Sequence, residues 1–212
     1  MVQLELDGSI VQSIRGVYRP MHITSFQGNL FVPEYLNNKI SVLNNGKFDA
    51  WPIAVYLKNP SGIAVNETSF AIANAGTHEV LYMKNSENLS FGSEGVNDGE
   101  FLQPTDVHFH NDKIYVADSR NHRVQIFDNN GKYLKTIGEK AYMDNTLGVF
   151  ANDKYILATD YNNDKVLTFN HKGKLIHTLV DFINKPSDLY IYQDKLYVAN
   201  YHGNSVTVYE WR

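Results

Sequence analysis

The stretch that decides the fold is PTDVHFHNDKIYVADSRNHRVQIFDNNGKYLKTIG, residues 104–138. Its apolar residues fall into short runs, separated by segments rich in Asn, Asp and Gly. Asn129-Asn-Gly131 is typical of a hairpin turn in which glycine supplies a left-handed backbone conformation. No part of the stretch has helical periodicity. It therefore predicts three or four short antiparallel strands.

The same pattern occurs five times along the chain. The copies are anchored at Pro20, Pro60, Pro104, Asn145 and Pro186, which are 40, 44, 41 and 41 residues apart. A period of this size is typical of the blades of a β-propeller. In each copy the second strand is continuously apolar, as expected where neighbouring blades cover both of its faces. These runs are residues 30–32, 70–73, 114–117, 155–158 and 196–199. The sequence predicts an all-β fold, a five-bladed propeller of four-stranded antiparallel blades that forms one domain over residues 1–212.

Several short motifs then point to a family. Gly99-Glu-Phe101-Leu-Gln-Pro104, Val116-Ala-Asp118 and Asn121-His-Arg-Val124 together resemble the signature of NHL repeats. The third copy resembles it best, and the fourth has the equivalent step Ala158-Thr-Asp160. The other copies are looser at the Asp position, where they carry Glu34, Asn74 and Asn200. The resemblance implies a propeller. It also implies two known activities as alternatives, because NHL-like propellers include lyases and hydrolases with sites at the channel mouth, commonly with a metal, and some NHL propellers bind RNA.

The two ends of the chain suggest how the ring closes. The fifth copy reaches Arg212 after its third strand, and residues 2–16 resemble the third and fourth strands of a repeat. We therefore expect residues 9–15 to be the fourth strand of the last blade, which would close the ring and remove an exposed sheet edge. Residues 2–6 then duplicate a third strand, as an extra edge strand or as a remnant of another blade.

Composition excludes some chemistry. The chain has no cysteine, so disulfides, thiol catalysis and thiolate metal sites are excluded. Its formal charge of -4 argues against nucleic acid, whose binding depends on clustered Lys and Arg. The first seven residues alternate polar and apolar side chains and include acids, so they predict neither a signal peptide nor a membrane span. We expect a soluble protein, and the sequence leaves its compartment open.

Strand direction predicts where a site would lie. In a meander of four antiparallel strands, the connection before the first strand and the loop between the second and third strands lie at the same end. These loops are longer and less regular than the tight turns at the other end. We therefore expect function on this loop-bearing face.

Three groups of side chains are candidates for binding on that face. The first is His22, Asp106 and Asp188, two residues past their anchors at the mouth of the channel. Imidazole and carboxylate groups together can bind a metal or a polar ligand. In the alternative interpretation, the two Asp side chains cap backbone amides between blades.

The second group is Tyr35, Tyr161 and Tyr201, which share one register and could stack on a sugar or another flat ligand. The alternative is packing between blades. The third group is Arg120, His122 and His202, which could bind an anion or exchange protons, although surface His and Arg residues usually do neither. Asp118 and Asp160 recur too regularly for catalysis, and we expect them to order the loops.

The leading hypothesis is a non-enzymatic binding scaffold for a protein, peptide or glycan, monomeric and without a cofactor. No nucleophile elbow, phosphate loop or metalloprotease spacing is present in the sequence. The alternative is a propeller enzyme, a lyase or hydrolase, whose site at the channel mouth would use His22, Asp106 and Asp188. RNA binding ranks last, because Arg120 is the one strongly basic residue among these loop positions.

Overall fold

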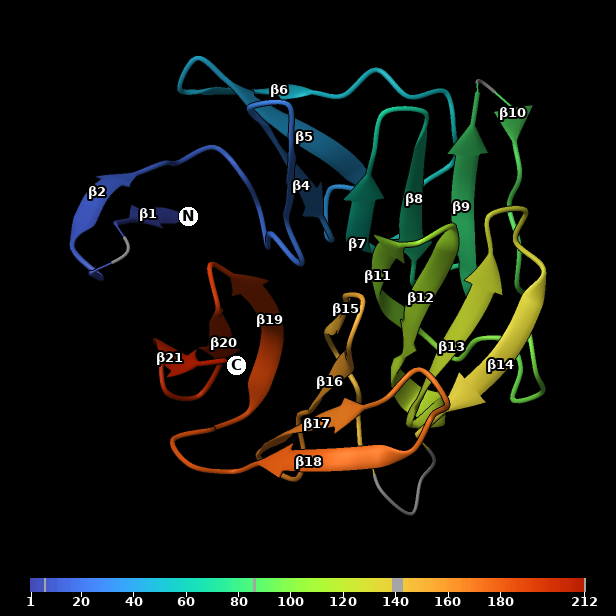
Figure 1. Cartoon of the computed structure of the whole chain (residues 1–212). Helices are drawn as coiled ribbons and strands as arrows, with labels where there is room; N and C mark the ends of the chain where they lie inside the picture. Colours follow the sequence, from blue (N-terminus) through green and yellow to red (C-terminus); the bar gives the residue numbers. More distant parts are fainter. Residues whose placement is uncertain (6, 86, 139–142, 212) are drawn as a thin grey trace.

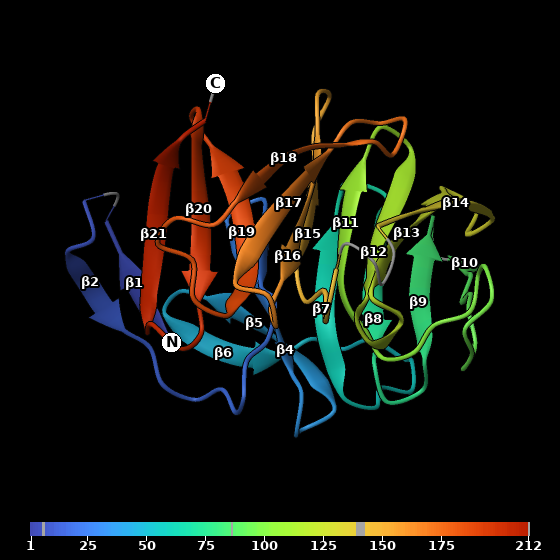
Figure 2. The same ribbon diagram turned by 90° about the horizontal axis from the view of Figure 1, so that it is seen from below.

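A computed structural model describes residues 1–5, 7–85, 87–138 and 143–211. Five antiparallel sheets stand side by side around a central axis (Figure 1), and each sheet is built from consecutive strands. Viewed from below, the sheets stand upright around the same axis (Figure 2). The five-bladed, all-β architecture expected from the repeats is therefore confirmed. Within the described ranges, no helix is both long enough and apolar enough to cross a membrane.

The blades follow chain order, and in each the first strand lies nearest the axis. The first two blades contain β3 (Thr24–Phe26), β4 (Asn29–Glu34), β5 (Lys39–Asn44), β6 (Lys47–Ala50), β7 (Pro60–Val65), β8 (Ser69–Asn74), β9 (Glu79–Lys84) and β10 (Glu87–Asn88). The third and fourth contain β11 (Pro104–His110), β12 (Lys113–Asp118), β13 (Arg123–Asp128), β14 (Tyr133–Ile137), β15 (Val149–Ala151), β16 (Ile156–Asp160), β17 (Lys165–Phe169) and β18 (Leu175–Leu179). The fifth contains β19 (Pro186–Tyr192), β20 (Lys195–Asn200) and β21 (Ser205–Glu210). A single 3-10 turn, η1 (Ser119–Asn121), lies between β12 and β13.

The core lies between the blades. Every residue of β8, and every residue of β12 after Lys113, is buried, because neighbouring sheets cover both faces of these strands. Tyr115 and Ala117 of the third blade pack with Val149 and Leu167 of the fourth. The continuously apolar second strands of the sequence are thus the strands around which adjacent blades pack.

The predicted closure of the ring is wrong. The segment expected to complete the last blade forms β2 (Ile10–Ser13), which pairs with β1 (Val2–Leu4), while the last sheet has three strands in the described part of the chain. A tight turn explains this pairing, because Gly8 adopts a φ of 88° and the Asp7 carboxylate accepts the Ser9 amide at 2.8 Å. Residues 2–16 do resemble the third and fourth strands of a blade, but β1 and β2 pair with each other and form a separate sheet.

One polar contact recurs in all five blades. A buried side-chain oxygen at the end of the second strand accepts the backbone N–H of the residue two positions before the first-strand anchor. The five pairs are Glu34 with Tyr18, Asn74 with Lys58, Asp118 with Leu102, Asp160 with Asp144, and Asn200 with Asn184, at 2.7–3.0 Å. We call this contact the blade latch. It confirms the structural role expected of Asp118 and Asp160, and shows that Glu and Asn perform it as well.

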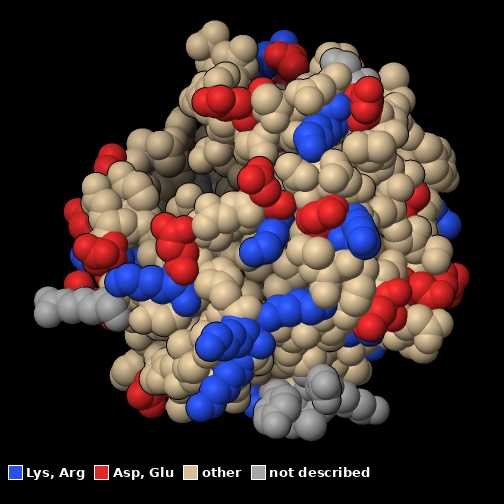
Figure 3. All heavy atoms as spheres, turned by 45° about the vertical axis from the view of Figure 1, so that its right-hand side comes forward, with Lys and Arg blue, Asp and Glu red and all other residues tan. Residues whose placement is uncertain are grey.

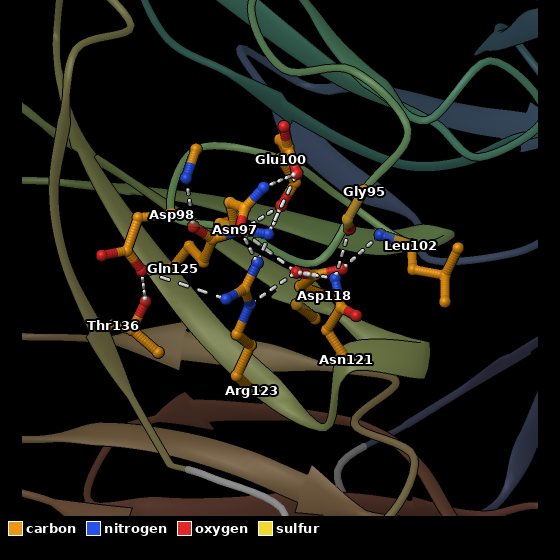
Figure 4. A network of polar contacts seen from close by, with 12 residues as sticks. Gly95, Asn97, Asp98, Glu100, Leu102, Asp118, Asn121, Arg123, Gln125 and Thr136 are labelled. Atoms are coloured by element: carbon orange, nitrogen blue, oxygen red, sulfur yellow. Dashed lines mark hydrogen bonds and ion pairs between the residues drawn. The ribbon is translucent and has the colours of Figure 1, made fainter.

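The latch of the third blade belongs to a wider network of polar contacts (Figure 4). The second oxygen of Asp118 accepts hydrogen bonds from Asn121 at 2.9 Å, Arg123 at 2.8 Å and Gln125 at 3.0 Å. Arg123 also donates to the backbone oxygen of Glu100 at 2.9 Å. One buried carboxylate thus holds the loop before the blade, the loop after its second strand and its third strand together.

Replacing Asp118 tests the latch. We expect Asp118→Ala to lower the free energy of unfolding by about 3–5 kcal/mol, because it leaves Arg123 and the Leu102 amide without their buried partner. Asp118→Asn retains an acceptor, as Asn74 does in the second blade, and should lose only about 1–2 kcal/mol. Urea denaturation of the two variants measures the difference. Equal losses would contradict a role for the acceptor oxygen.

The latch of the first blade gives a pH dependence. Burial acts to raise the pKa of Glu34, but hydrogen bonds from Ser41, the Tyr18 amide and Asn37 outweigh it and hold the pKa below its ordinary value. Lys39 adds an ion pair at 3.1 Å. A carboxyl group whose pKa is lower in the folded state stabilises the fold above its unfolded pKa of about 4.3, and this contribution is lost as the pH falls through the folded value.

We therefore expect the wild-type protein to lose more stability than Glu34→Gln as the pH is lowered from about 5 to 3. Urea denaturation at each pH measures both proteins, and their difference isolates Glu34 from other carboxylates. Parallel pH profiles would show that this carboxylate is not held in its charged form.

Candidate functional site

The predicted loop-bearing face is present. In each blade the loop after the second strand donates a backbone hydrogen bond to the connection that precedes the first strand. These bonds are Tyr35 to Arg19, Gly76 to Lys58, Arg120 to Leu102, Tyr161 to Asn145, and Tyr201 to Lys185. The two sets of loops are therefore joined at one end of every blade, as strand direction required.

Exposed apolar side chains gather in these loops. Six large apolar residues in them are 60–85% exposed: Tyr18, Leu36, Tyr56, Val96, Phe182 and Tyr201. Charge distinguishes the surface less, because acidic and basic side chains are interspersed over most of the side drawn in Figure 3, apart from a basic group in its lower part. The loops of the loop-bearing face are thus distinguished by their exposed apolar side chains.

The predicted tyrosine group is brought together in part. The rings of Tyr161 and Tyr201 lie 6.2 Å apart, and His202 lies 5.7 Å from Tyr201 and 6.4 Å from Tyr161. The Lys185 ammonium lies 5.8 Å from the centre of the Tyr161 ring. We call these four residues the tyrosine cluster. Lys185 was not among the sequence candidates, although its place beside the anchor Pro186 puts it in the same loops.

The third tyrosine and the Arg-His group behave differently. Tyr35 stacks under Arg19, whose guanidinium carbon is 4.9 Å from the ring centre. His122 connects two blades, since its Nδ1 accepts the Asn145 amide at 3.1 Å and lies 3.1 Å from the Asp144 carboxylate. Among the described residues, no hydrogen bond or ion pair joins Arg120, His122 and His202 to one another, and anion binding by this group stays a prediction.

His122 belongs to a second recurring contact between blades. Each residue at this position has a positive φ, and its side chain accepts the amide just before the next blade. The donors and acceptors are Asn59 to Asn38, Gln103 to His78, Asn145 to His122, and Lys185 to Asp164, at 2.8–3.1 Å. In the described part of the chain, the equivalent Asn204 makes no such bond to the first blade. The four interfaces between consecutive blades are pinned in this way, and the gap between the fifth and first blades is not.

The predicted channel group is brought together. His22, Asp106 and Asp188 come from the first, third and fifth blades, and their ligand atoms lie within 4.8 Å of one another. His22 Nδ1 is 3.3 Å from Asp188 Oδ1 and 3.9 Å from Asp106 Oδ2. The three side chains converge near the axis of the propeller: Asp106 and Asp188 from β11 and β19, and His22 from the segment just before β3.

The expected capping of backbone amides is also present. Asp106 accepts the Val107 amide at 2.8 Å and, across the blade interface, the Val149 amide at 2.9 Å. Asp188 accepts the Leu189 amide at 2.8 Å. These bonds fix the carboxylates at the inner ends of β11 and β19. The two interpretations are therefore compatible, because the same oxygens that cap amides also face His22.

Electrostatics in the group are strong because it is buried. Burial acts to lower the pKa of His22, but the negative charges of Asp188 and Asp106 raise it to about 9. Burial raises the pKa of Asp106 in spite of the opposing effect of His22. Nearby, burial lowers the pKa of His108 to about 4, and this ring lies 3.0 Å from the Ala151 carbonyl oxygen. The group lies in a cavity of about 420 Å³ lined by the inner strands.

Two glycines make room for the carboxylates. A Cβ on Gly62 would lie 2.6 Å from the Asp106 Cα, and one on Gly148 would lie 3.0 Å from the Asp188 Cα. In the blade just before each Asp, glycine therefore occupies the position equivalent to that of Asp106 and Asp188, two residues after the anchor.

The position of Gly148 also corrects the predicted anchor of the fourth blade, because Thr146, and not Asn145, is equivalent to Pro104. The shared contact shows this, as Ser61 donates to the Pro104 carbonyl at 2.9 Å and Thr105 to that of Thr146 at 3.1 Å.

Comparison with known proteins agrees with the fold. Residues 101–127 match the family model of the NHL repeat, which confirms the resemblance seen in the third copy. The "Protein brain tumor" of Drosophila melanogaster is 34% identical over an alignment of 95 residues, and the match covers 41% of this chain and 9% of that protein. The match thus spans less than a tenth of the curated relative.

Several solved structures share the architecture. A nidogen/laminin complex contains a chain that aligns with 99% of this one and 84% of its own length, at a TM-score of 0.80 and 12% identity. An inactive virginiamycin B lyase from Staphylococcus aureus with quinupristin aligns over 98% and 75%, at 0.71 and 14% identity. A streptogramin B lyase aligns over 99% and 75%, also at 0.71 and 14%. At these identities the similarity shows the fold alone.

The glycines of the channel can be tested by adding a methyl group. We expect Gly62→Ala to lower the free energy of unfolding by about 1–3 kcal/mol, because its Cβ would overlap the Asp106 backbone. Gly148→Ala should cost less, since its nearest contact is longer. Urea denaturation ranks the two variants. A larger loss for Gly148→Ala would contradict the ranking expected from the two Cβ contact distances.

Proposed function

We propose that this NHL-repeat propeller is a binding module that presents its loop-bearing face to a protein or peptide. The observation that carries the proposal is the tyrosine cluster, in which the exposed Tyr201 lies against Tyr161 and His202 in the loops of that face. Exposed apolar side chains that are in contact with one another mark interaction surfaces, whereas single scattered ones do not. Tyrosine is also among the residue types that dominate binding energy at protein interfaces.

The tyrosine cluster is the best-ordered part of this surface. Tyr161 is partly buried, and its ring lies at a tilt beside that of Tyr201, a residue that is 65% exposed. Lys185 is held over Tyr161 by its contact with Asp164 at 3.3 Å. Rings that are already positioned lose little conformational entropy on binding. Phe182, 85% exposed, precedes this cluster in the same connection and would extend it.

One similar protein supports the proposal at the level of the fold. A chain of the same architecture occurs in a nidogen/laminin complex, which is an assembly of proteins. The alternative of a propeller enzyme has counterparts in the two lyase structures, at 14% identity. The loop-bearing face of this chain favours binding, and the enzyme remains a hypothesis that concerns the channel.

Peptide and glycan arrays probed with the purified chain test the proposal. We expect peptide binding that falls at least tenfold in Tyr201→Ala and in Phe182→Ala, because both remove exposed apolar area without touching the core. Tyr192→Ala is the matched control, since Tyr192 is an exposed tyrosine at the opposite end of β19. Melting curves check that all three variants fold.

The outcomes separate the possibilities. Peptide binding that is lost in the two loop variants and retained in Tyr192→Ala supports the proposal. Binding of glycans alone overturns the assignment to a protein or peptide. Binding to neither array, or an equal loss in Tyr192→Ala, overturns the assignment of this face.

A further inference from the structure

We propose that His22, Asp106 and Asp188 form a binding site for one divalent cation of the zinc class at the centre of the propeller. One imidazole nitrogen and two carboxylate oxygens are a donor set typical of zinc. The three side chains offer these atoms within 4.8 Å of one another. They come from three different blades, so the fold and not local sequence brings them together.

The nitrogen of His22 is the observation that points to a ligand. Its side chain is 7% exposed, and the buried Nδ1 has no hydrogen-bond partner in the described part of the chain. A buried polar atom without a partner is costly, and native proteins rarely leave one unexplained. A cation bound to this nitrogen would remove that cost.

The distances suit a shared cation. Ligands at 2.0–2.2 Å from a tetrahedral zinc ion lie roughly 3.3–3.6 Å from each other. The Asp188 oxygen lies 3.3 Å from His22 Nδ1, and the Asp106 oxygen lies 3.9 Å from it. The first distance is that of two ligands on one ion. The second is longer, and the two carboxylate oxygens lie within 4.8 Å of each other, so the Asp side chains would have to move toward a bound ion.

The carboxylates are available and already oriented. Each Asp106 oxygen accepts one backbone amide and keeps a second lone pair. Asp188 accepts a single amide through Oδ1. Hydrogen bonds of this kind orient the ligands of a metal without using up their capacity to bind it. The close approach permitted by Gly62 and Gly148 brings both groups to the axis.

Charge favours a divalent ion. Two carboxylates, of which Asp106 is buried and Asp188 is partly exposed, place two negative charges beside one imidazole, and a protonated His22 would balance only one of them. A divalent cation with a neutral imidazole would balance them. Three protein ligands leave a fourth position toward the cavity of about 420 Å³, where water or a small ligand would bind.

The ion would also link the first and fifth blades. Strand pairing does not join these blades among the described residues, and His22 and Asp188 face each other from the two sides of the gap. Binding to the folded state alone would raise the melting temperature in proportion to the logarithm of the free ion concentration.

Titration of the purified chain after treatment with EDTA tests the site. We expect isothermal titration calorimetry to show one Zn²⁺ per chain, and Co²⁺ to give the visible absorption of a site with nitrogen and oxygen ligands. His22→Gln and Asp188→Asn should weaken Zn²⁺ binding at least tenfold. His177→Ala, which removes an exposed histidine of the outermost strand β18, should bind as the wild type does.

Folding of the variants is checked separately. Asp188→Asn keeps an oxygen that can accept the Leu189 amide, so its melting temperature without metal should stay close to that of the wild type. Zn²⁺ should raise the melting temperature of the wild type and not that of Asp188→Asn.

The proposal is overturned if the wild type binds no stoichiometric Zn²⁺, or if Asp188→Asn binds it equally well. Tight binding of Mg²⁺ or Ca²⁺ in place of Zn²⁺ overturns the zinc class. None of these results depends on Tyr201 or Phe182, so the proposed binding function is tested independently.

Discussion

The blade latch is the interaction on which the rest of the structure depends. In every blade a buried oxygen at the end of the second strand accepts the amide of the chain that enters the blade, at 2.7–3.0 Å. A backbone amide buried without a partner would cost about 1–3 kcal/mol. The latch satisfies that amide and places the first strand on the axis. It also sets where the two loops of each blade meet, and so it builds the face on which binding is proposed.

The latch explains why the repeats can diverge so far. What the position requires is an acceptor oxygen, and Asp, Glu and Asn all supply one. The partner that the third strand offers then decides which of these three residue types occupies the position. Asp118 and Glu34 face Arg123 and Lys39, whereas the amide of Asn200 donates to Thr207 at 2.7 Å. The latch residue is therefore acidic where the third strand begins with a cation and is Asn where it begins with Glu79 or Ser205, although the latch geometry is the same.

Much of the fold could be predicted from the sequence, because blade packing leaves a periodic record. The second strands are continuously apolar, and the hairpin turns carry glycine. The prediction was wrong where the choice depends on competing partners. β2 could pair with the last blade or with β1, and a turn at Gly8 made the nearer strand its partner. At Asn145 the register was wrong by one residue, because no proline marks the anchor of that blade.

Some features of the candidate site could be predicted from the sequence, and others could not. Strand register identified His22, Asp106 and Asp188, since each lies at the same place in its blade. The role of His122 could not be predicted, because its Nδ1 contacts an amide 23 residues away in the next blade. Nor could the alternation of glycine and Asp around the channel be recognised. An anchor at Asn145 places Leu147, and not Gly148, two residues after the anchor.

The gap between the fifth and first blades affects how the blades stabilise one another against local unfolding. Four interfaces of similar construction join five blades in a row, so the stability of each blade comes from its nearest neighbours, as in a linear array. The blades at the two ends have one such neighbour, and the third blade has two. Hydrogen exchange should therefore be fastest in β4 and β20 and slowest in β12, which makes the centre of the sequence the last part to open.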